Sequence, residues 1–63
     1  TASYERVFER GQQDAIVELE RRAASLGANA VIGITVNTGT IKLDETGVLL
    51  LITATGTAIR LRN

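Results

Sequence analysis

The hydrophobic pattern of this sequence changes its period once, at Gly27, and the change divides the chain into two parts. Before Gly27, apolar residues recur every three or four positions, which is the spacing of one helix face. We therefore expect a helix over about residues 3–26. Gly27 follows the last residue of this pattern and suits the left-handed position that ends a helix. The apolar positions are Tyr4, Val7, Phe8, Ala15, Ile16, Leu19, Ala23 and Leu26.

Two long segments with strand-like composition follow, at about residues 30–43 and 47–61. Both are rich in Val, Ile, Leu and Thr, and residues 44–47, Asp-Glu-Thr-Gly, form a good turn sequence between them. The simplest fold is α+β: one helix packed on a long antiparallel hairpin, in a single domain over residues 1–63. Because common strands have five or six residues, we expect a bulge or a second turn near Gly39, within residues 37–40.

The start of the second strand is apolar on both faces, because Val48-Leu49-Leu50-Leu51-Ile52 has no polar residue. One helix covers only one face of a sheet, so the other face needs a second cover. We expect that cover to be another copy of the chain. The residues predicted to form this oligomer interface are Val48, Leu49, Leu51, Thr53, Thr55, Thr57 and Phe8.

Small residues mark the places where the helix and the hairpin are expected to approach closely. Ala54, Gly56 and Ala58 alternate along the second strand and form a track on which the helix can lie. Gly11 interrupts the helix at a cost of about 1 kcal/mol relative to Ala, so close approach of another backbone is expected there, with a mild kink as the alternative.

The threonine row of the second strand, Thr53, Thr55 and Thr57, has two interpretations. Threonine is frequent in strands because it packs well on a pleated surface, so the row is compatible with a wetted or subunit-facing side of the sheet. Alternatively, the row forms a ring of hydroxyl groups around an oligomer axis and coordinates an ion or water.

Size and composition favour an oligomer over a monomer. A 63-residue domain hides only about 60% of the surface that its unfolded chain exposes, which leaves little stability. The sequence contains no cysteine for disulfides and no Cys/His set for a structural zinc. Association of identical chains is the remaining way to bury more apolar surface.

Charge and hydropathy narrow the classes of partner. Seven Lys/Arg balance seven Asp/Glu, so no net field attracts nucleic acid. No apolar run approaches the roughly 20 residues that span a bilayer, and no signal-peptide pattern appears in these residues. We therefore expect a cytoplasmic chain whose main partner is itself.

Catalytic and metal-binding chemistry have little support in the residue types. Without His, Cys or Trp, and with Lys42 as the sole lysine, no nucleophile has an obvious base, so we expect neither an enzyme nor a bound cofactor. The best cluster of oxygen ligands is Asp44 and Glu45 in the turn, with Asn37 nearby. Ordinary turn chemistry explains the same residues.

Three blocks of this sequence resemble the YbjQ-like "putative heavy-metal-binding" domain family. They are residues 4–7 (Tyr-Glu-Arg-Val), 26–33 (Leu-Gly-Ala-Asn-Ala-Val-Ile-Gly) and 52–59 (Ile-Thr-Ala-Thr-Gly-Thr-Ala-Ile). The resemblance implies a small α+β domain that assembles into ring-shaped homo-oligomers, typically pentamers. Family members usually carry a further β region before the helix, so an upstream segment or neighbouring chains are expected to cover the exposed sheet edges.

The resemblance and the residues together predict a ring-like, pentameric homo-oligomer with a structural or assembly role. The alternative is an oligomer that binds a metal ion or a small ligand at its subunit boundaries. Soft metals prefer thiolate or imidazole ligands, which this sequence lacks, so the metal alternative depends on oxygen ligands alone.

Overall fold

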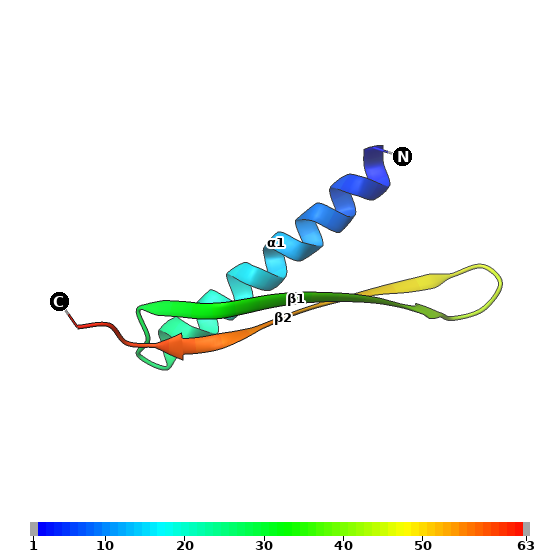
Figure 1. Cartoon of the computed structure of the whole chain (residues 1–63). Coiled ribbons are helices and arrows are strands. Elements are labelled where there is room, and N and C mark those ends of the chain that lie inside the picture. Colours follow the sequence, from blue (N-terminus) through cyan, green and yellow to red (C-terminus); the bar gives the residue numbers. More distant parts are fainter. Residues whose placement is uncertain (1, 63) are drawn as a thin grey trace.

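A computed structural model describes the backbone of residues 2–62 and the side chains of residues 5–62. It contains helix α1 (Ala2–Ser25), strand β1 (Ala30–Lys42) and strand β2 (Val48–Ile59) (Figure 1). The two strands form one antiparallel hairpin, and α1 lies across one of its faces. The predicted α+β fold of one helix and one hairpin is confirmed. The side chain of Tyr4, part of the first family-like block, lies outside the described residues.

Helix α1 ends at Gly27 in the way that the sequence predicts. Gly27 has a φ of 87°, in the left-handed region that favours glycine. Its N–H donates to the carbonyl of Ala24 at 2.9 Å, and the N–H of Ala28 donates to the carbonyl of Ala23 at 3.1 Å. These two bonds form a Schellman motif and satisfy carbonyl groups that the helix end would leave free.

The chain after Gly27 is fastened to the end of the hairpin by side-chain hydrogen bonds. The side-chain oxygen of Asn29 accepts from the N–H of Leu61 at 2.7 Å, and its Nδ2 donates to the Leu61 carbonyl at 3.0 Å. Arg60 Nη1 donates to the carbonyl of Gly27 at 2.8 Å. The helix end, the start of β1 and the residues after β2 are thereby held together.

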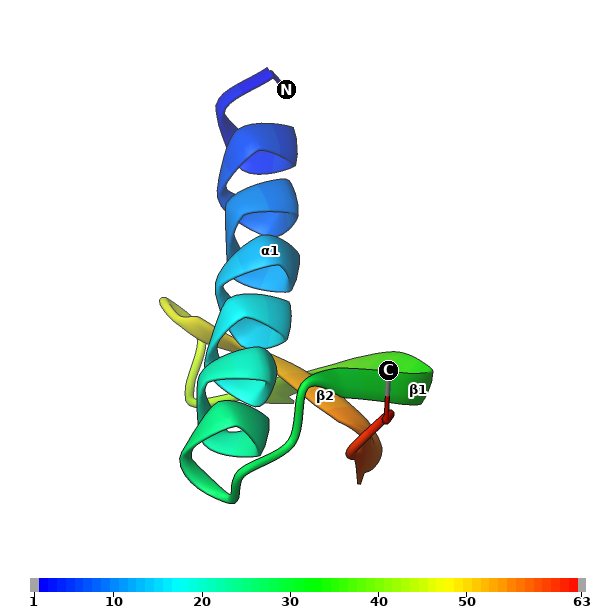
Figure 2. The same ribbon diagram turned by 90° about the vertical axis from the view of Figure 1, so that its left-hand side faces the viewer.

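Helix α1 crosses the hairpin obliquely, and its first turns rise away from the strands (Figures 1 and 2). Gly11 marks the close approach that the sequence predicts. A Cβ atom added at Gly11 would lie 2.5 Å from Cδ1 of Ile52 in β2. The neighbour of Gly11 is thus a side chain, whereas the sequence suggested another backbone.

The β-bulge lies near the start of β1 and not at Gly39, so its predicted position is wrong. Pairing is continuous from Thr35↔Thr55 to Lys42↔Val48, and the register shifts between Ile32 and Thr35. Gly33, with a φ of 64°, and Ile34 together oppose the single residue Gly56. The bulge forms there because Gly33 adopts the left-handed conformation that this type of bulge requires.

The track of small residues in β2 serves two neighbours, not the helix alone as the sequence suggested. Ala54 lines a hollow beneath α1. A Cβ atom added at Gly56, in contrast, would lie 2.8 Å from Cγ1 of Val31 and 3.4 Å from Cγ1 of Ile34, which are both in β1. Gly56 therefore makes room for the side chains around the bulge.

Little of the chain is buried, and its shape is extended. Among residues with described side chains, only Ala23 counts as buried, with 5% of its surface exposed. The radius of gyration is 14.9 Å, whereas a compact 63-residue domain has about 11 Å. The accessible surface is 5281 Å², against about 3,900 Å² for a compact chain of 6.7 kDa. The residues with described side chains therefore form no closed hydrophobic core.

Candidate functional site

The register of the hairpin assigns its side chains to two faces. Directly paired residues of an antiparallel ladder share a face, and neighbours along a strand alternate. The face of Ile52 lies against α1, as its approach to Gly11 shows. We call the opposite side the uncovered face. Its residues are Ala30, Ile32, Thr35, Asn37, Gly39 and Ile41 in β1 and Leu49, Leu51, Thr53, Thr55, Thr57 and Ile59 in β2.

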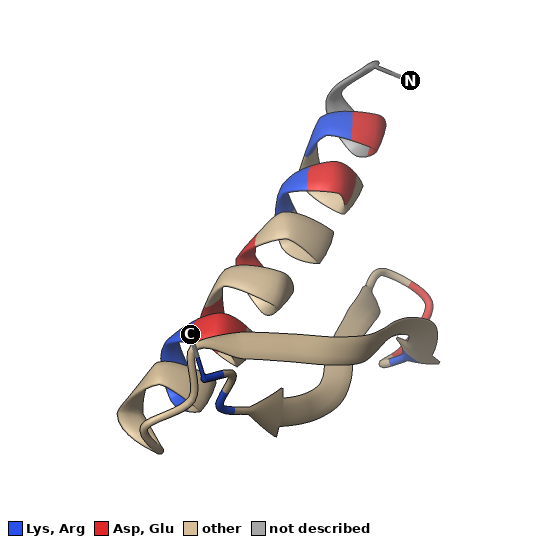
Figure 3. Cartoon of the chain, turned by 60° about the vertical axis from the view of Figure 1, so that its left-hand side comes forward, with Lys and Arg blue, Asp and Glu red and all other residues tan. Residues whose placement is uncertain are grey.

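The uncovered face has no charged residue. Lys42 is the only charged residue in the two strands, and its partner Val48 places it on the helix side. The other charges lie on α1, in the turn and after β2 (Figure 3). Side chains that point from a sheet into water are normally charged or strongly polar. Because the uncovered face has no charge, its composition is that of a surface that contacts protein.

The uncovered face is divided into an apolar half and a hydroxyl-rich half. Near the turn, Ile41 pairs with Leu49, and Leu51 pairs with Gly39. These three large side chains are 44–45% exposed. Nearer the bulge, the cross-strand pairs are Thr35↔Thr55 and Asn37↔Thr53. Exposed apolar side chains gathered on one surface mark interaction sites, so the apolar half is the strongest candidate for contact with protein.

The predicted interface residues fall on more than one surface. Five of them, Leu49, Leu51, Thr53, Thr55 and Thr57, share the uncovered face. Val48 lies on the opposite face of the sheet and is 66% exposed, and Phe8 is half-buried on α1, one turn before Gly11. The β1 members of the uncovered face could not be identified from the sequence, because the sequence pattern does not fix the strand pairing that places them.

The predicted metal-ligand residues are not brought together. Asp44 lies in the turn, where one carboxylate oxygen accepts from the N–H and the hydroxyl of Thr46, each at 2.7 Å. These bonds hold the pKa of Asp44 below its ordinary value. Glu45 is its exposed neighbour in the turn. Asn37 pairs with Thr53 within the ladder, seven residues and on the order of 20 Å along the strand from Asp44.

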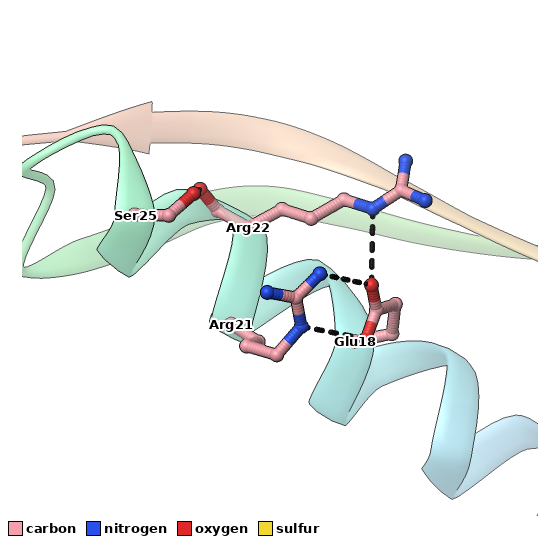
Figure 4. Close-up of polar contacts among 4 residues, drawn as sticks. All are labelled: Glu18, Arg21, Arg22 and Ser25. Carbon is pink, nitrogen blue, oxygen red and sulfur yellow. Dashed lines mark hydrogen bonds and ion pairs between the residues drawn. The ribbon is translucent and has the colours of Figure 1, made fainter.

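A second polar cluster lies on the last turns of α1 and is explained by ion pairing. Glu18 accepts from Arg21 at 2.6 and 2.9 Å and from Arg22 Nε at 3.1 Å (Figure 4). The hydrogen bonds from Arg21, followed by those from Arg22, lower the pKa of Glu18 from 4.5 to about 2. Both carboxylate oxygens of Glu18 thus accept hydrogen bonds from the two arginines, so the cluster is accounted for as an ion-pair network on the helix surface.

Hollows lined by the described residues are open to solvent. A groove of about 440 Å³ runs along α1 from Arg6 to Val17, and every residue that lines it belongs to that one helix. Ligand sites normally enclose most of the ligand between several elements, which one helix cannot do. Over the described part of the chain, α1 is also too polar to cross a membrane.

Comparison with known proteins gives one family. A family model described as "Putative heavy-metal-binding", YbjQ_1, matches residues 1–62. A UPF0145 protein of Nostoc punctiforme is 71% identical over 62 residues, which cover 98% of this chain and 57% of the relative. A UPF0145 protein of Trichodesmium erythraeum is 62% identical over 61 residues, covering 97% of this chain and 56% of the relative.

A more distant UPF0145 protein, from a Synechococcus species, is 42% identical over 62 residues, covering 98% of this chain and 55% of the relative. The chain thus spans a little over half the length of the curated relatives that it matches. No solved structure matches the chain.

The residues of this chain do not fit the metal in the description of the matching family. The sequence has no cysteine and no histidine, which are the ligands that soft and borderline metals select. Hard cations need six or more oxygen ligands from several groups. Within the described residues, no three of the Asp and Glu side chains gather into a possible metal site. One carboxylate oxygen of Asp44 moreover already accepts two hydrogen bonds from Thr46.

Proposed function

This chain belongs to the YbjQ family, and from that premise we propose that it is a structural module whose role is to assemble with copies of itself. The observation that carries the proposal is the missing core: the accessible surface exceeds that of a compact chain by about 1,400 Å². A standard protein interface buries about 800 Å² on each partner. The excess is therefore large enough to supply an interface and still leave a normal surface.

The uncovered face is the surface that we propose meets the neighbouring copy. Its apolar half, Ile41, Leu49 and Leu51, would be removed from water by contact between copies. A face without charge can contact an identical face without bringing like charges together. The ring-like, pentameric form of the assembly rests on the family resemblance.

A structural role is favoured over catalysis by the residue types of the uncovered face. Its polar groups are threonine hydroxyls and the amide of Asn37, and the sequence has no histidine or cysteine to activate them. The alternative, an oligomer that holds a metal ion or small ligand between subunits, would have to use these neutral oxygens. The donor set described above gives that alternative no support for heavy metals.

Native mass spectrometry combined with small-angle scattering tests the proposal on the unmodified chain at micromolar concentration. We expect one closed oligomeric species. Its circular dichroism spectrum should show helix and strand signals, and these signals should decrease when the chain is diluted below the dissociation constant of the oligomer. A folded monomer that melts cooperatively at all concentrations would overturn the proposal. Concentration-dependent melting is the independent check, because oligomer stability depends on mass action.

A further inference from the structure

The first turns of α1 carry the apolar side of the helix away from the hairpin (Figures 1 and 2). Val7 is 65% exposed, and Phe8 is half-buried. Gly11 lies between them on the helix surface, because positions three and four apart share a face. A side chain at Gly11 would meet Ile52 of β2, so the apolar side of the helix leaves the hairpin at this point. We call Val7, Phe8 and Gly11 the α1 stripe.

Exposed charged residues flank the α1 stripe in two rows of opposite sign. Glu5 and Glu9 form an acidic row, and Arg6 and Arg10 form a basic row, each pair being four residues apart. At about 100° per residue, the two rows lie on opposite sides of the stripe, with the basic row next to Val7. A surface that complements the stripe therefore has an apolar centre and an acidic edge on the side of the arginines.

The apolar half of the uncovered face has this arrangement. Ile41, Leu49 and Leu51 form an apolar centre without charge. The turn directly beyond them carries Asp44 and Glu45, which are both exposed (Figure 3). On the other side of this centre lies the neutral, hydroxyl-rich half of the face. An apolar centre with one acidic edge is the complement of an apolar stripe with one basic row.

We propose that the α1 stripe of one copy lies on the apolar half of the uncovered face of the next copy, with Arg6 and Arg10 beside its acidic turn. The proposal rests on the proposed function, because it names the surface that the uncovered face meets. The contact joins two different surfaces, so every copy can use both, and a suitable rotation closes the copies into a ring. The hairpin then has one helix on each face, as a sheet with two apolar faces requires.

Contact between two identical uncovered faces is less consistent with the structure. Such a pair has two-fold symmetry and uses one patch on each copy, so the α1 stripe would stay in water. A contact between different surfaces uses two patches on each copy. The surface excess of about 1,400 Å² gives each patch about 700 Å², which is near the roughly 800 Å² that each partner contributes to a standard interface.

Cross-linking between introduced cysteines tests the contact directly, because the sequence has no cysteine of its own. The Val7→Cys and Leu49→Cys chains are unfolded together, refolded and treated with a short bis-maleimide reagent. We expect cross-linked dimers that contain one chain of each variant. Val17→Cys is the matched control, because Val17 is a similarly exposed valine on a different side of α1 from the stripe. The mixed dimers should be lost when Val17→Cys replaces Val7→Cys.

Native mass spectrometry of the same chains separates a failure of the stripe contact from a failure of the proposed function. An oligomer in which Leu49→Cys chains cross-link to one another, and not to Val7→Cys, would overturn the stripe contact and leave self-assembly in place. An oligomer without cross-links between either pair would have the same meaning. A monomer at micromolar concentration would overturn the proposed function and the stripe contact with it.

Charge reversal provides a second test that needs no cysteine. Arg6 and Glu45 are both exposed, so reversing either charge should leave the fold intact, which circular dichroism checks. We expect Arg6→Glu and Glu45→Arg each to raise the dissociation constant of the oligomer about two- to fivefold. The double variant should return to within about twofold of the wild type, because the reversed charges attract each other again. Effects that multiply in the double variant would overturn the stripe contact.

Discussion

Gly11 of α1 faces Ile52 of β2 so closely that an added Cβ atom would lie 2.5 Å from the Ile52 Cδ1 atom. This contact limits how closely α1 and β2 can approach each other at these two residues. A glycine inside a helix costs about 1 kcal/mol relative to alanine, so the close approach has a measurable cost in helix stability.

The Gly11 contact can be tested with a double-mutant cycle. Gly11→Ala alone should raise the free energy of unfolding by less than the roughly 1 kcal/mol expected from helix propensity, because the new methyl group displaces the Ile52 side chain. Ile52→Val removes the Cδ1 atom that the new methyl group would meet. In the Ile52→Val background, Gly11→Ala should therefore raise the free energy of unfolding by the full amount expected from helix propensity. Urea unfolding should show a favourable coupling of about 0.5–1 kcal/mol. Additive effects within experimental error would show that the two residues do not restrict each other.

Gly56 and Gly39 offer a matched pair of substitutions in the hairpin. A side chain at Gly56 meets Val31 and Ile34 beside the bulge, whereas one at Gly39 meets nothing within 4 Å, and neither glycine has a positive φ. Gly56→Val should therefore destabilise the chain by about 1–3 kcal/mol. Gly39→Val should be neutral or stabilising, because valine favours strands. Thermal melting would contradict this account if Gly39→Val were the more damaging change.

Acid should weaken the end of α1 through Glu18. Its pKa falls from 4.5 to about 2 on folding, so the unfolded chain binds the proton more tightly than the folded chain. The stabilisation from Glu18 is thus complete above about pH 4.5 and is lost as pH falls to about 2. Carbon-detected NMR should show that the Glu18 carboxyl titrates with a midpoint near pH 2, and that this midpoint rises in the Arg21→Gln variant. A midpoint unchanged by that substitution would contradict the hydrogen bonds in Figure 4.

Metal binding is expected to be absent from this chain, because its donor set lacks thiolate and imidazole groups. Addition of Zn²⁺ or Cd²⁺ at tenfold excess should leave the melting temperature and the amide NMR spectrum unchanged. Asp44→Asn removes the best oxygen ligand and serves as the control for weak binding in the turn. A metal-dependent rise in melting temperature that Asp44→Asn abolishes would show that the turn does bind cations.

The helix end could be predicted from the sequence because its cause is local. Gly27 follows the last apolar residue of α1 and takes the left-handed conformation within its own few residues. The turn at Asp44 is local in the same sense, since its side chain bonds to Thr46 two residues on. Both features depend on neighbours in sequence, so sequence patterns describe them well.

The bulge and the face of Val48 could not be predicted because they depend on pairing between strands. Gly33 lies between two isoleucines and Gly39 between two threonines, and neither neighbourhood by itself specifies a bulge. In the structure the bulge lies at Gly33, opposite Gly56. Once the bulge lies before Thr35, the remaining register is continuous and places Val48 with Lys42 on the helix side. The alternation of faces along β2 was visible in the sequence, whereas the choice of covered face was not.

The central claim, that copies of this chain associate through the uncovered face, is tested most directly by sedimentation equilibrium of the wild type beside Leu51→Asp. Leu51 is 44% exposed on that face, and Val17, 55% exposed on α1, provides the control Val17→Asp. We expect an oligomer for the wild type and Val17→Asp, and smaller species for Leu51→Asp, because a charge buried in the interface is costly. An unchanged subunit number and melting temperature for Leu51→Asp would contradict the claim.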